Sequence, residues 1–179
     1  MRIMKQELLK IMKERRSVRS YKKDLMIPED VLQEILETAT YAPTGGGRQS
    51  PVIIAVTDKT MRDHIAHLNA KIMGDENADP FYGAPVILVV LANKAIPTHV
   101  YDGSLVMGNL MNAAESLGVA NIWIHRAKEE FESDFGKNIF ADLGIEGEYE
   151  GIGHCALGYA VEPAKKAAPR KEDYVYYIR

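Results

Sequence analysis

Apolar residues along this chain follow two different spacings, and the two alternate. Helical spacing, at intervals of three and four, predicts amphipathic helices over residues 3–16, 28–42, 59–73, 99–117 and 128–143. Short uninterrupted apolar runs, typical of buried strands, occupy residues 52–57, 86–92, 120–124 and 152–159. Strands separated by helices predict a layered fold of the α/β or α+β class.

The loops and the C-terminal segment carry further signals. Glycine, proline and small polar residues predict loops over 44–51 and 74–85. No repeat or interdomain linker is visible, so residues 1–179 are expected to form a single domain, with a core of 1–162 and a tail of 163–179. The aromatic run 174–178 would suit pairing with a sheet edge, either in this chain or in a partner.

Composition excludes some classes of protein and points to a local charge. The 179 residues are 46% hydrophobic and 26% charged, which is typical of a globular protein and not of a disordered one. Net charge is −3, yet residues 1–24 hold nine basic and three acidic side chains. The rest of the chain is acidic and would repel a nucleic acid, so a small anionic ligand is the favoured partner. A solvated basic helix is the alternative interpretation.

Cysteine content and the apolar runs bear on the compartment. The single cysteine, Cys155, excludes an internal disulfide and any metal site built from several cysteines. The segment Met1–Lys5 is charged and lacks the apolar core of a signal peptide. The longest apolar run, 86–92, is far shorter than the ~20 residues that span a bilayer. We therefore expect a cytoplasmic protein without a membrane partner.

Three arginines and a serine form the strongest chemical signal. Arg15, Arg16, Ser17 and Arg19 follow directly after the first predicted helix. Guanidinium groups are forked, permanently charged donors that match phosphate oxygens. If the segment is extended, Arg15, Ser17 and Arg19 share one face. The segment is therefore a candidate phosphate site, with simple solvent exposure as the alternative.

The remaining candidates give weaker signals. The loop 44–47 lacks the Gly-Lys-Ser/Thr of a P-loop, although its glycines would let the backbone approach a flat ligand. His64 and His67 could form half of a metal site, but no further ligand stands near them, so no metal is expected. Cys155 lies in an apolar strand and is expected to be a buried, unreactive thiol.

Several short motifs occur along the chain in an order that is more specific than any one of them alone. They are Arg-Arg-Ser-Val-Arg-Ser-Tyr at 15–21, Ala-Pro-Thr-Gly-Gly-Gly-Arg-Gln-Ser-Pro at 42–51, and the segments 83–87, 102–104, 109–114, 117–124, 156–159 and 169–171. From about residue 11 to residue 171 the chain thereby resembles the nitroreductase family. The resemblance implies an α+β fold, a three-layer α/β/α sandwich around a mixed, mainly antiparallel sheet of four to five strands. It also implies a homodimer that exchanges its C-terminal tails.

The same resemblance implies a function and a set of site residues. The expected activity is that of an FMN-dependent oxidoreductase, which passes hydride from NAD(P)H through flavin N5 to a nitroaromatic, quinone or similar flat acceptor by a ping-pong mechanism. The flavin itself carries the chemistry, so no catalytic side chain is expected. The implied FMN contacts are Arg15, Arg16, Ser17, Arg19 and Arg170 at the phosphate and ribityl chain; Pro43, Thr44 and Gly45 at the ring, from the partner; Asn69 and Lys71 at the pyrimidine end; and the backbone of Ile124, His125 and Arg126 beside N5.

One departure and two alternatives accompany this expectation. Gly47 stands where the family loop usually has an asparagine, so an amide contact is lost there. A flavin-binding relative could instead perform dehalogenation, flavin fragmentation or flavin handling, and substrate profiling would reveal it. A non-enzymatic module could grip an acidic partner or nucleic acid through residues 1–24, and it would be colourless with salt-sensitive binding.

Overall fold

An antiparallel sheet forms the centre of the protein. The computed structural model describes residues 2–179, with side chains from Glu7 onward. Four strands, β1 (Pro51–Val56), β2 (Val86–Asn93), β3 (Ala120–Ile124) and β4 (Tyr149–Gly158), lie in the order β1-β2-β4-β3. Every neighbouring pair is antiparallel, and one isolated parallel bridge joins Ser17 to Asn121 on β3. The predicted mainly antiparallel sheet is confirmed.

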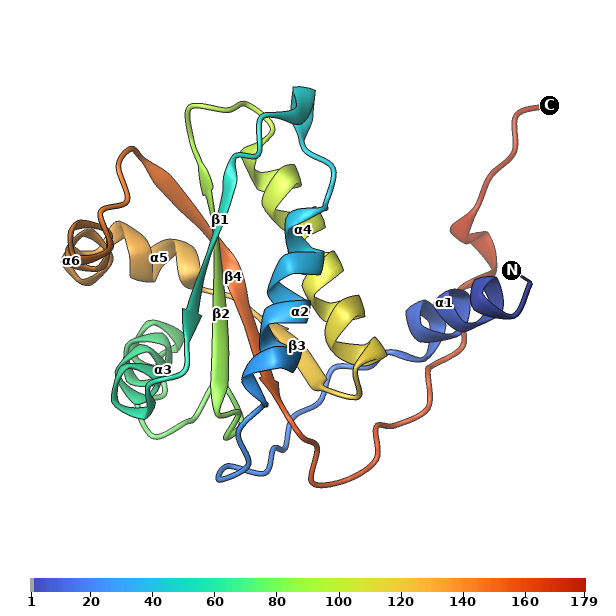
Figure 1. The fold of residues 1–179 in the computed structure, drawn as a ribbon, viewed down its shortest axis with the longest axis horizontal. Coiled ribbons are helices and arrows are strands. Elements are labelled where there is room, and N and C mark those ends of the chain that lie inside the picture. The colour runs from blue at the N-terminus through green and yellow to red at the C-terminus, as the bar shows by residue number, and fades with distance from the viewer. Residues whose placement is uncertain (1) are drawn as a thin grey trace.

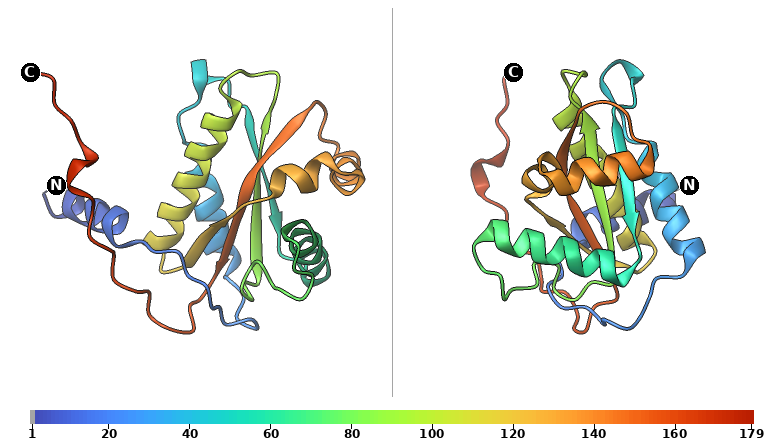
Figure 2. Two further views of the ribbon diagram at one scale, coloured as in Figure 1. Left: turned by 180° about the vertical axis from the view of Figure 1, so that it is seen from behind. Right: turned by 90° about the vertical axis from the view of Figure 1, so that its left-hand side faces the viewer.

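The alternation of side chains along β2 creates two cores. Val86, Leu88 and Val90 face one core, which α2 (Glu29–Thr40) and α4 (His99–Ser116) complete. Ile87 and Val89 face the other, completed by α3 (Lys59–Met73), α5 (Ala127–Glu132) and α6 (Asp134–Leu143). Successive residues of a strand point to opposite faces, so a strand buried on both sides reads as a continuous apolar run. Figures 1 and 2 show the three layers that follow, which confirm the predicted sandwich.

The predicted helix over 128–143 is broken into α5 and α6. Ser133, between them, has an extended backbone with φ −78° and ψ 172°. Gly136 then packs so closely on the preceding helix that a Cβ there would lie 2.3 Å from Phe131 Cα. The break folds the two short helices against each other over one face of the sheet.

Both ends of the chain lie away from the sandwich. Helix α1 (Arg2–Glu14) contacts α4 and otherwise projects outward, beside the C-terminal tail (Figure 1). The aromatic run 174–178 joins no strand of its own chain, and a short 3-10 turn (Glu172–Tyr174) precedes it. Across the described residues, no helix is long and apolar enough to cross a membrane.

Candidate cofactor site

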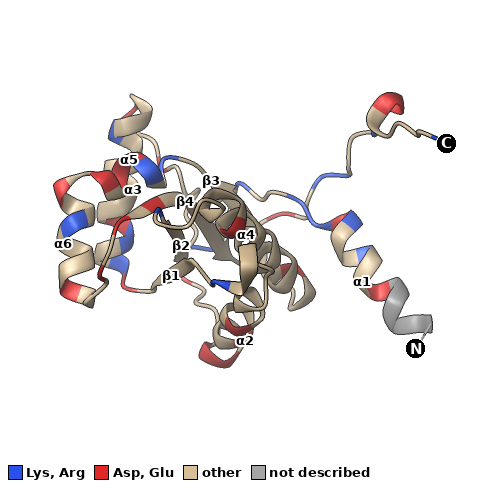
Figure 3. Ribbon diagram, turned by 90° about the horizontal axis from the view of Figure 1, so that it is seen from above, with Lys and Arg blue, Asp and Glu red and all other residues tan. Residues whose placement is uncertain are grey.

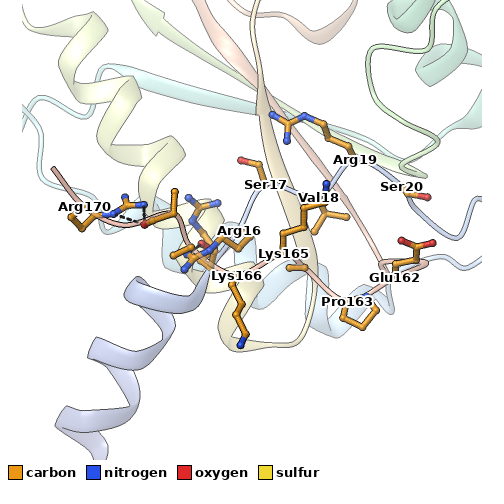
Figure 4. A pocket seen from close by; sticks show the side chains of 14 residues that line it. Arg16, Ser17, Val18, Arg19, Ser20, Glu162, Pro163, Lys165, Lys166 and Arg170 are labelled. Atoms are coloured by element: carbon orange, nitrogen blue, oxygen red, sulfur yellow. Dashed lines mark hydrogen bonds between the residues drawn. The ribbon is translucent and has the colours of Figure 1, made fainter.

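A basic groove lies between the segment after α1 and the start of the tail. Its volume is about 640 Å³, and it is lined by residues 15–20, 162–168 and 170. Six of the lining side chains are basic and one is acidic: Arg15, Arg16, Arg19, Lys165, Lys166 and Arg170, with Glu162. Figure 3 shows basic residues on both segments where the chain leaves α1 and where the tail returns, and Figure 4 shows the groove from close by. The predicted arginine cluster and Arg170 are thus brought to one groove.

Backbone hydrogen bonds to the sheet fix this groove. Val18 N–H donates to Asn121 O at 3.1 Å, which ties the segment to the edge strand β3. Farther along, Lys22 N–H donates to Tyr159 O at 2.9 Å and Val161 N–H donates to Ser20 O at 3.1 Å. These bonds hold residues 17–22 extended and place the first residues of the tail beside them. The extended backbone is the condition under which alternate side chains share a face.

The four arginines that line the groove have unused hydrogen-bond donors. No carboxylate among the described residues forms an ion pair with any of these arginines. Arg16 is half-buried, and its Nε has no hydrogen-bond partner although it is shielded from solvent. Arg15 makes a 3.4 Å contact from Nη1 to Asn121 Oδ1. A buried donor without an acceptor costs free energy, which an anionic oxygen would recover. The donor set therefore fits a phosphate group.

A second group of predicted residues gathers at the far end of β3. Asn69, on α3, is fully buried and donates from Nδ2 to His125 O at 3.0 Å. Its Oδ1 accepts from Arg126 Nε at 2.9 Å. Arg126 takes a left-handed backbone conformation with φ 78°, which is uncommon outside glycine. His125 lies four residue steps beyond Asn121 along the strand, about 13 Å at ~3.3 Å per residue, so the groove and this loop lie along one sheet edge.

The two residues of α3 that are predicted to contact the flavin, Asn69 and Lys71, point in different directions. Residues two positions apart on a helix differ by about 200° in direction. Asn69 therefore faces the loop after β3, whereas Lys71 is exposed in the last turn of α3. Of the two, only Asn69 reaches His125 and Arg126.

The glycine loop lies at the opposite end of the sheet from the groove. A 3-10 turn, η1 (Gly45–Gly47), follows α2 at the top of Figure 1. Its anchor is Asp102 of α4, which accepts from Gly45 N at 2.9 Å, Ser50 Oγ at 2.8 Å and Thr98 Oγ1 at 3.0 Å. Burial raises the pKa of this carboxyl, but the three hydrogen bonds outweigh burial and hold the pKa below its usual value. Pro43, Thr44 and Gly45 do not approach the groove of their own chain.

The other candidates of the sequence have ordinary surroundings. His64 and His67 are exposed, and His64 packs against the Phe135 ring at 4.9 Å between centroids. No group of three or more metal-ligating side chains occurs in the part of the chain that the structure describes. Cys155 is fully buried, and burial raises the pKa of its thiol to about 12, so the thiolate form is suppressed at neutral pH.

Some residues of the site gave no signal strong enough to single them out. Asn121 and His154 are fully buried polar side chains inside largely apolar strands, and that interruption is their only mark in the sequence. Glu130 is also fully buried, but it stands among other charged residues of α5, and nothing in the sequence distinguishes it from them. Lys165 and Lys166 are lysines of a polar tail. Their place in the groove depends on the chain returning to its own N-terminal segment.

Solved structures of known proteins are similar to this chain over nearly its whole length. A nitroreductase from Bacteroides fragilis, solved with bound FMN, superposes with a TM-score of 0.87 at 26% identity, covering 97% of this chain and 99% of that one. Another from Desulfitobacterium hafniense, also solved with FMN, gives a TM-score of 0.83 at 28% identity, covering 97% and 98%.

Sequence comparison leads to the same group of proteins. A protein of Methanothermobacter thermautotrophicus, named "Putative NADH dehydrogenase/NAD(P)H nitroreductase", is 27% identical over 131 residues. The match covers 68% of this chain and 62% of that relative, so the chain spans less than two thirds of its length. The profile of the Nitroreductase family matches residues 12–159, which is most of the chain. On this evidence the chain belongs to the Nitroreductase family.

Proposed function

We propose that this protein is an FMN-dependent NAD(P)H oxidoreductase that holds the flavin phosphate in the basic groove. One observation carries the proposal: four arginines that form no ion pair with the described residues line a single groove, and the buried Nε of Arg16 lacks an acceptor. The two similar solved structures are nitroreductases with bound FMN. A phosphate dianion would satisfy the free donors at Arg15, Arg16, Ser17, Arg19 and Arg170.

The flavin ring would lie toward the other end of β3. His125 and Arg126 stand there, and the backbone N–H groups of both find no acceptor among the described residues. Free N–H donors suit the N5 edge of a flavin ring. The Arg126 guanidinium would place positive charge on this side, where it would stabilise negative charge on a reduced ring.

A partner chain would complete the ring site. Pro43, Thr44 and Gly45 lie too far from the groove to serve the same flavin from the same chain, since η1 is at the other end of the sheet (Figure 1). In a homodimer, the loop of one chain would cover the site of the other. The glycines would allow backbone to approach the ring face without obstruction from a Cβ.

The residues bind and orient, while FMN when bound supplies the hydride chemistry. The groove fixes the phosphate end, and the loop after β3 fixes the ring edge. NAD(P)H and a flat acceptor, such as a nitroaromatic or a quinone, would occupy the same open face in turn. That exchange predicts ping-pong kinetics.

An anaerobic titration tests the proposal. Purified protein is mixed with FMN, the dissociation constant is measured by quenching of flavin fluorescence, and NADH or NADPH is then added. We expect FMN to bind, its 450-nm-region absorbance to bleach with a pyridine nucleotide, and a quinone or nitroaromatic to restore it. Failure to bind FMN would contradict the proposal, and so would binding without bleaching.

A further inference from the structure

A row of buried polar side chains runs from the middle of the sheet to the loop at the end of β3. His154 on β4 and Glu130 on α5 meet at 2.8 Å between Nε2 and Oε2. The other oxygen of Glu130 accepts from Asn69 Nδ2. Asn69 then holds His125 O and the side chain of Arg126. Four elements, β4, α5, α3 and the loop, are thus joined side chain to side chain.

Burial of these polar side chains costs free energy. His154, Glu130 and Asn69 are all 0% exposed. His154 Nδ1 has no hydrogen-bond partner, although the ring packs against Phe81 at 5.1 Å between centroids. Apolar residues of similar volume would often give equal or greater stability at such positions. The arrangement therefore calls for a role beyond stability.

The row has a specific effect on the loop. Both N–H bonds of the Asn69 amide are taken, one by His125 O and one by Glu130. With His125 O occupied and Arg126 held at φ 78°, the peptide groups of this short segment have fixed orientations. A residue other than glycine in the left-handed conformation is strained, and it persists only where its surroundings impose that conformation. The bonds through Asn69 impose it here.

We propose that His154, Glu130 and Asn69 form a positioning network, which holds the His125–Arg126 backbone and the Arg126 guanidinium against the ring of the flavin. This inference rests on the proposed function. It assigns Asn69 a role that acts through the loop, because its amide hydrogens are not free for a ligand. It also gives Glu130 and His154 a role, although neither lies in the groove.

Three substitutions test the network. Asn69→Ala removes both links to the loop, and Arg126→Ala removes one and leaves the core intact. Glu130→Gln keeps an oxygen for Asn69 but presents an amide to His154, so that end of the row must change its hydrogen bonding. Asp79→Asn is the control, because Asp79 holds another side chain of α3, Arg62, at 2.7 Å and 2.9 Å, outside the site.

The measurements separate position from binding. Apoprotein of each variant is titrated with FMN, and the loaded protein is examined by visible circular dichroism and by stopped-flow reduction with NADH. We expect Asn69→Ala and Arg126→Ala to change the flavin dichroism and to slow reduction about tenfold to a hundredfold, as misplacement of a reacting group does. FMN affinity should change less than about threefold, because the charge-assisted hydrogen bonds of the phosphate groove are unaltered. On a logarithmic scale, the loss of reduction rate in the double variant should be smaller than the sum of the two single losses, since both single substitutions remove the bond between Asn69 and Arg126.

Distinct results would overturn the two proposals. If wild-type protein binds no FMN, the proposed function fails. If wild-type protein is reduced by NADH and folded Asn69→Ala and Arg126→Ala proteins give unchanged dichroism and reduction rates, the positioning network fails while the function stands. Equal effects from Asp79→Asn would also overturn it, since they would show a general response to lost stability. If Asn69→Ala does not fold, Arg126→Ala decides the question, because its side chain is only half-buried.

Discussion

The side chain of Arg19 is exposed, so its contribution to the protein depends on what it binds. Unlike Arg15 and Arg16, it makes no hydrogen bond to the described residues. An exposed cation contributes little to folding by itself. Removal should therefore affect a ligand much more than the fold.

Arg19→Ala should raise the dissociation constant of FMN about tenfold to a hundredfold, since a hydrogen bond to a charged group contributes about 1.5–3 kcal/mol. The unfolding temperature of the apoprotein should stay unchanged. Fluorescence titration and a thermal melt measure the two quantities. Lys94→Ala is the matched control, because Lys94 is a partly exposed cation that reaches Glu148, outside the groove. An unaltered FMN affinity in Arg19→Ala would remove the phosphate role from this residue.

At the scale of elements, local signals and pairing explain what could be predicted. The bounds of α3 follow from its ends, where Asp58 caps the first turn through Met61 N at 2.8 Å and Gly74 closes it at φ 86°. Strand β4 starts at Tyr149, three residues before the predicted start, because its first residues pair with the end of β2. Pairing between distant segments leaves no local pattern in the sequence.

The glycine loop depends on α4 through Asp102, and this dependence predicts an effect of pH. The folded pKa of Asp102 lies below its ordinary value of 3.8, so the ionised carboxylate stabilises the fold above that value. As pH falls through the lower, folded pKa, this contribution is lost. Asp102→Asn, which cannot ionise, should lower the free energy of unfolding by about 1–3 kcal/mol at pH 7.

Urea unfolding at pH 7 and at pH 3 measures this contribution. The difference between wild type and Asp102→Asn should be largest at pH 7 and should shrink at pH 3. Asp142→Asn serves for comparison, because Asp142 is exposed and lies outside the loop. A difference that stays constant with pH would mean that the charge of Asp102 is not what holds the loop.

At the scale of the whole molecule, one chain brings together most of the predicted site residues, and the glycine loop is the part that it leaves apart. The predicted cluster at 15–19 and Arg170 meet in one groove because residues 17–22 are pinned to the sheet. Asn69 meets His125 and Arg126 because α3 and α5 pack together. The order of motifs could predict that these residues share a site. It could not predict which side of α3 faces the loop, since that depends on packing between elements.

The tail and α1 expose several large apolar and aromatic side chains. Each residue of the run 174–178 is at least 62% exposed, and Leu8, Leu9 and Met12 of α1 are exposed beside it. Contiguous apolar surface of this kind marks an interface. A second copy of the chain would cover it and bring the partner's glycine loop to the ring site, so association and flavin binding should depend on the same surface.

Replacing Tyr174, Tyr176 and Tyr177 together by serine should convert a dimer into a monomer, since each buried aromatic side chain contributes about 1.5–3 kcal/mol. Sedimentation equilibrium should give twice 20.0 kDa for wild-type protein and a single chain for the variant. FMN affinity should fall with it, because the ring site would lack the partner's loop. Arg170→Ala separates the two effects: it should weaken FMN binding and leave the dimer intact. A monomeric wild-type protein that binds FMN tightly would show instead that one chain forms the whole site, and the glycine loop would then have no part in it.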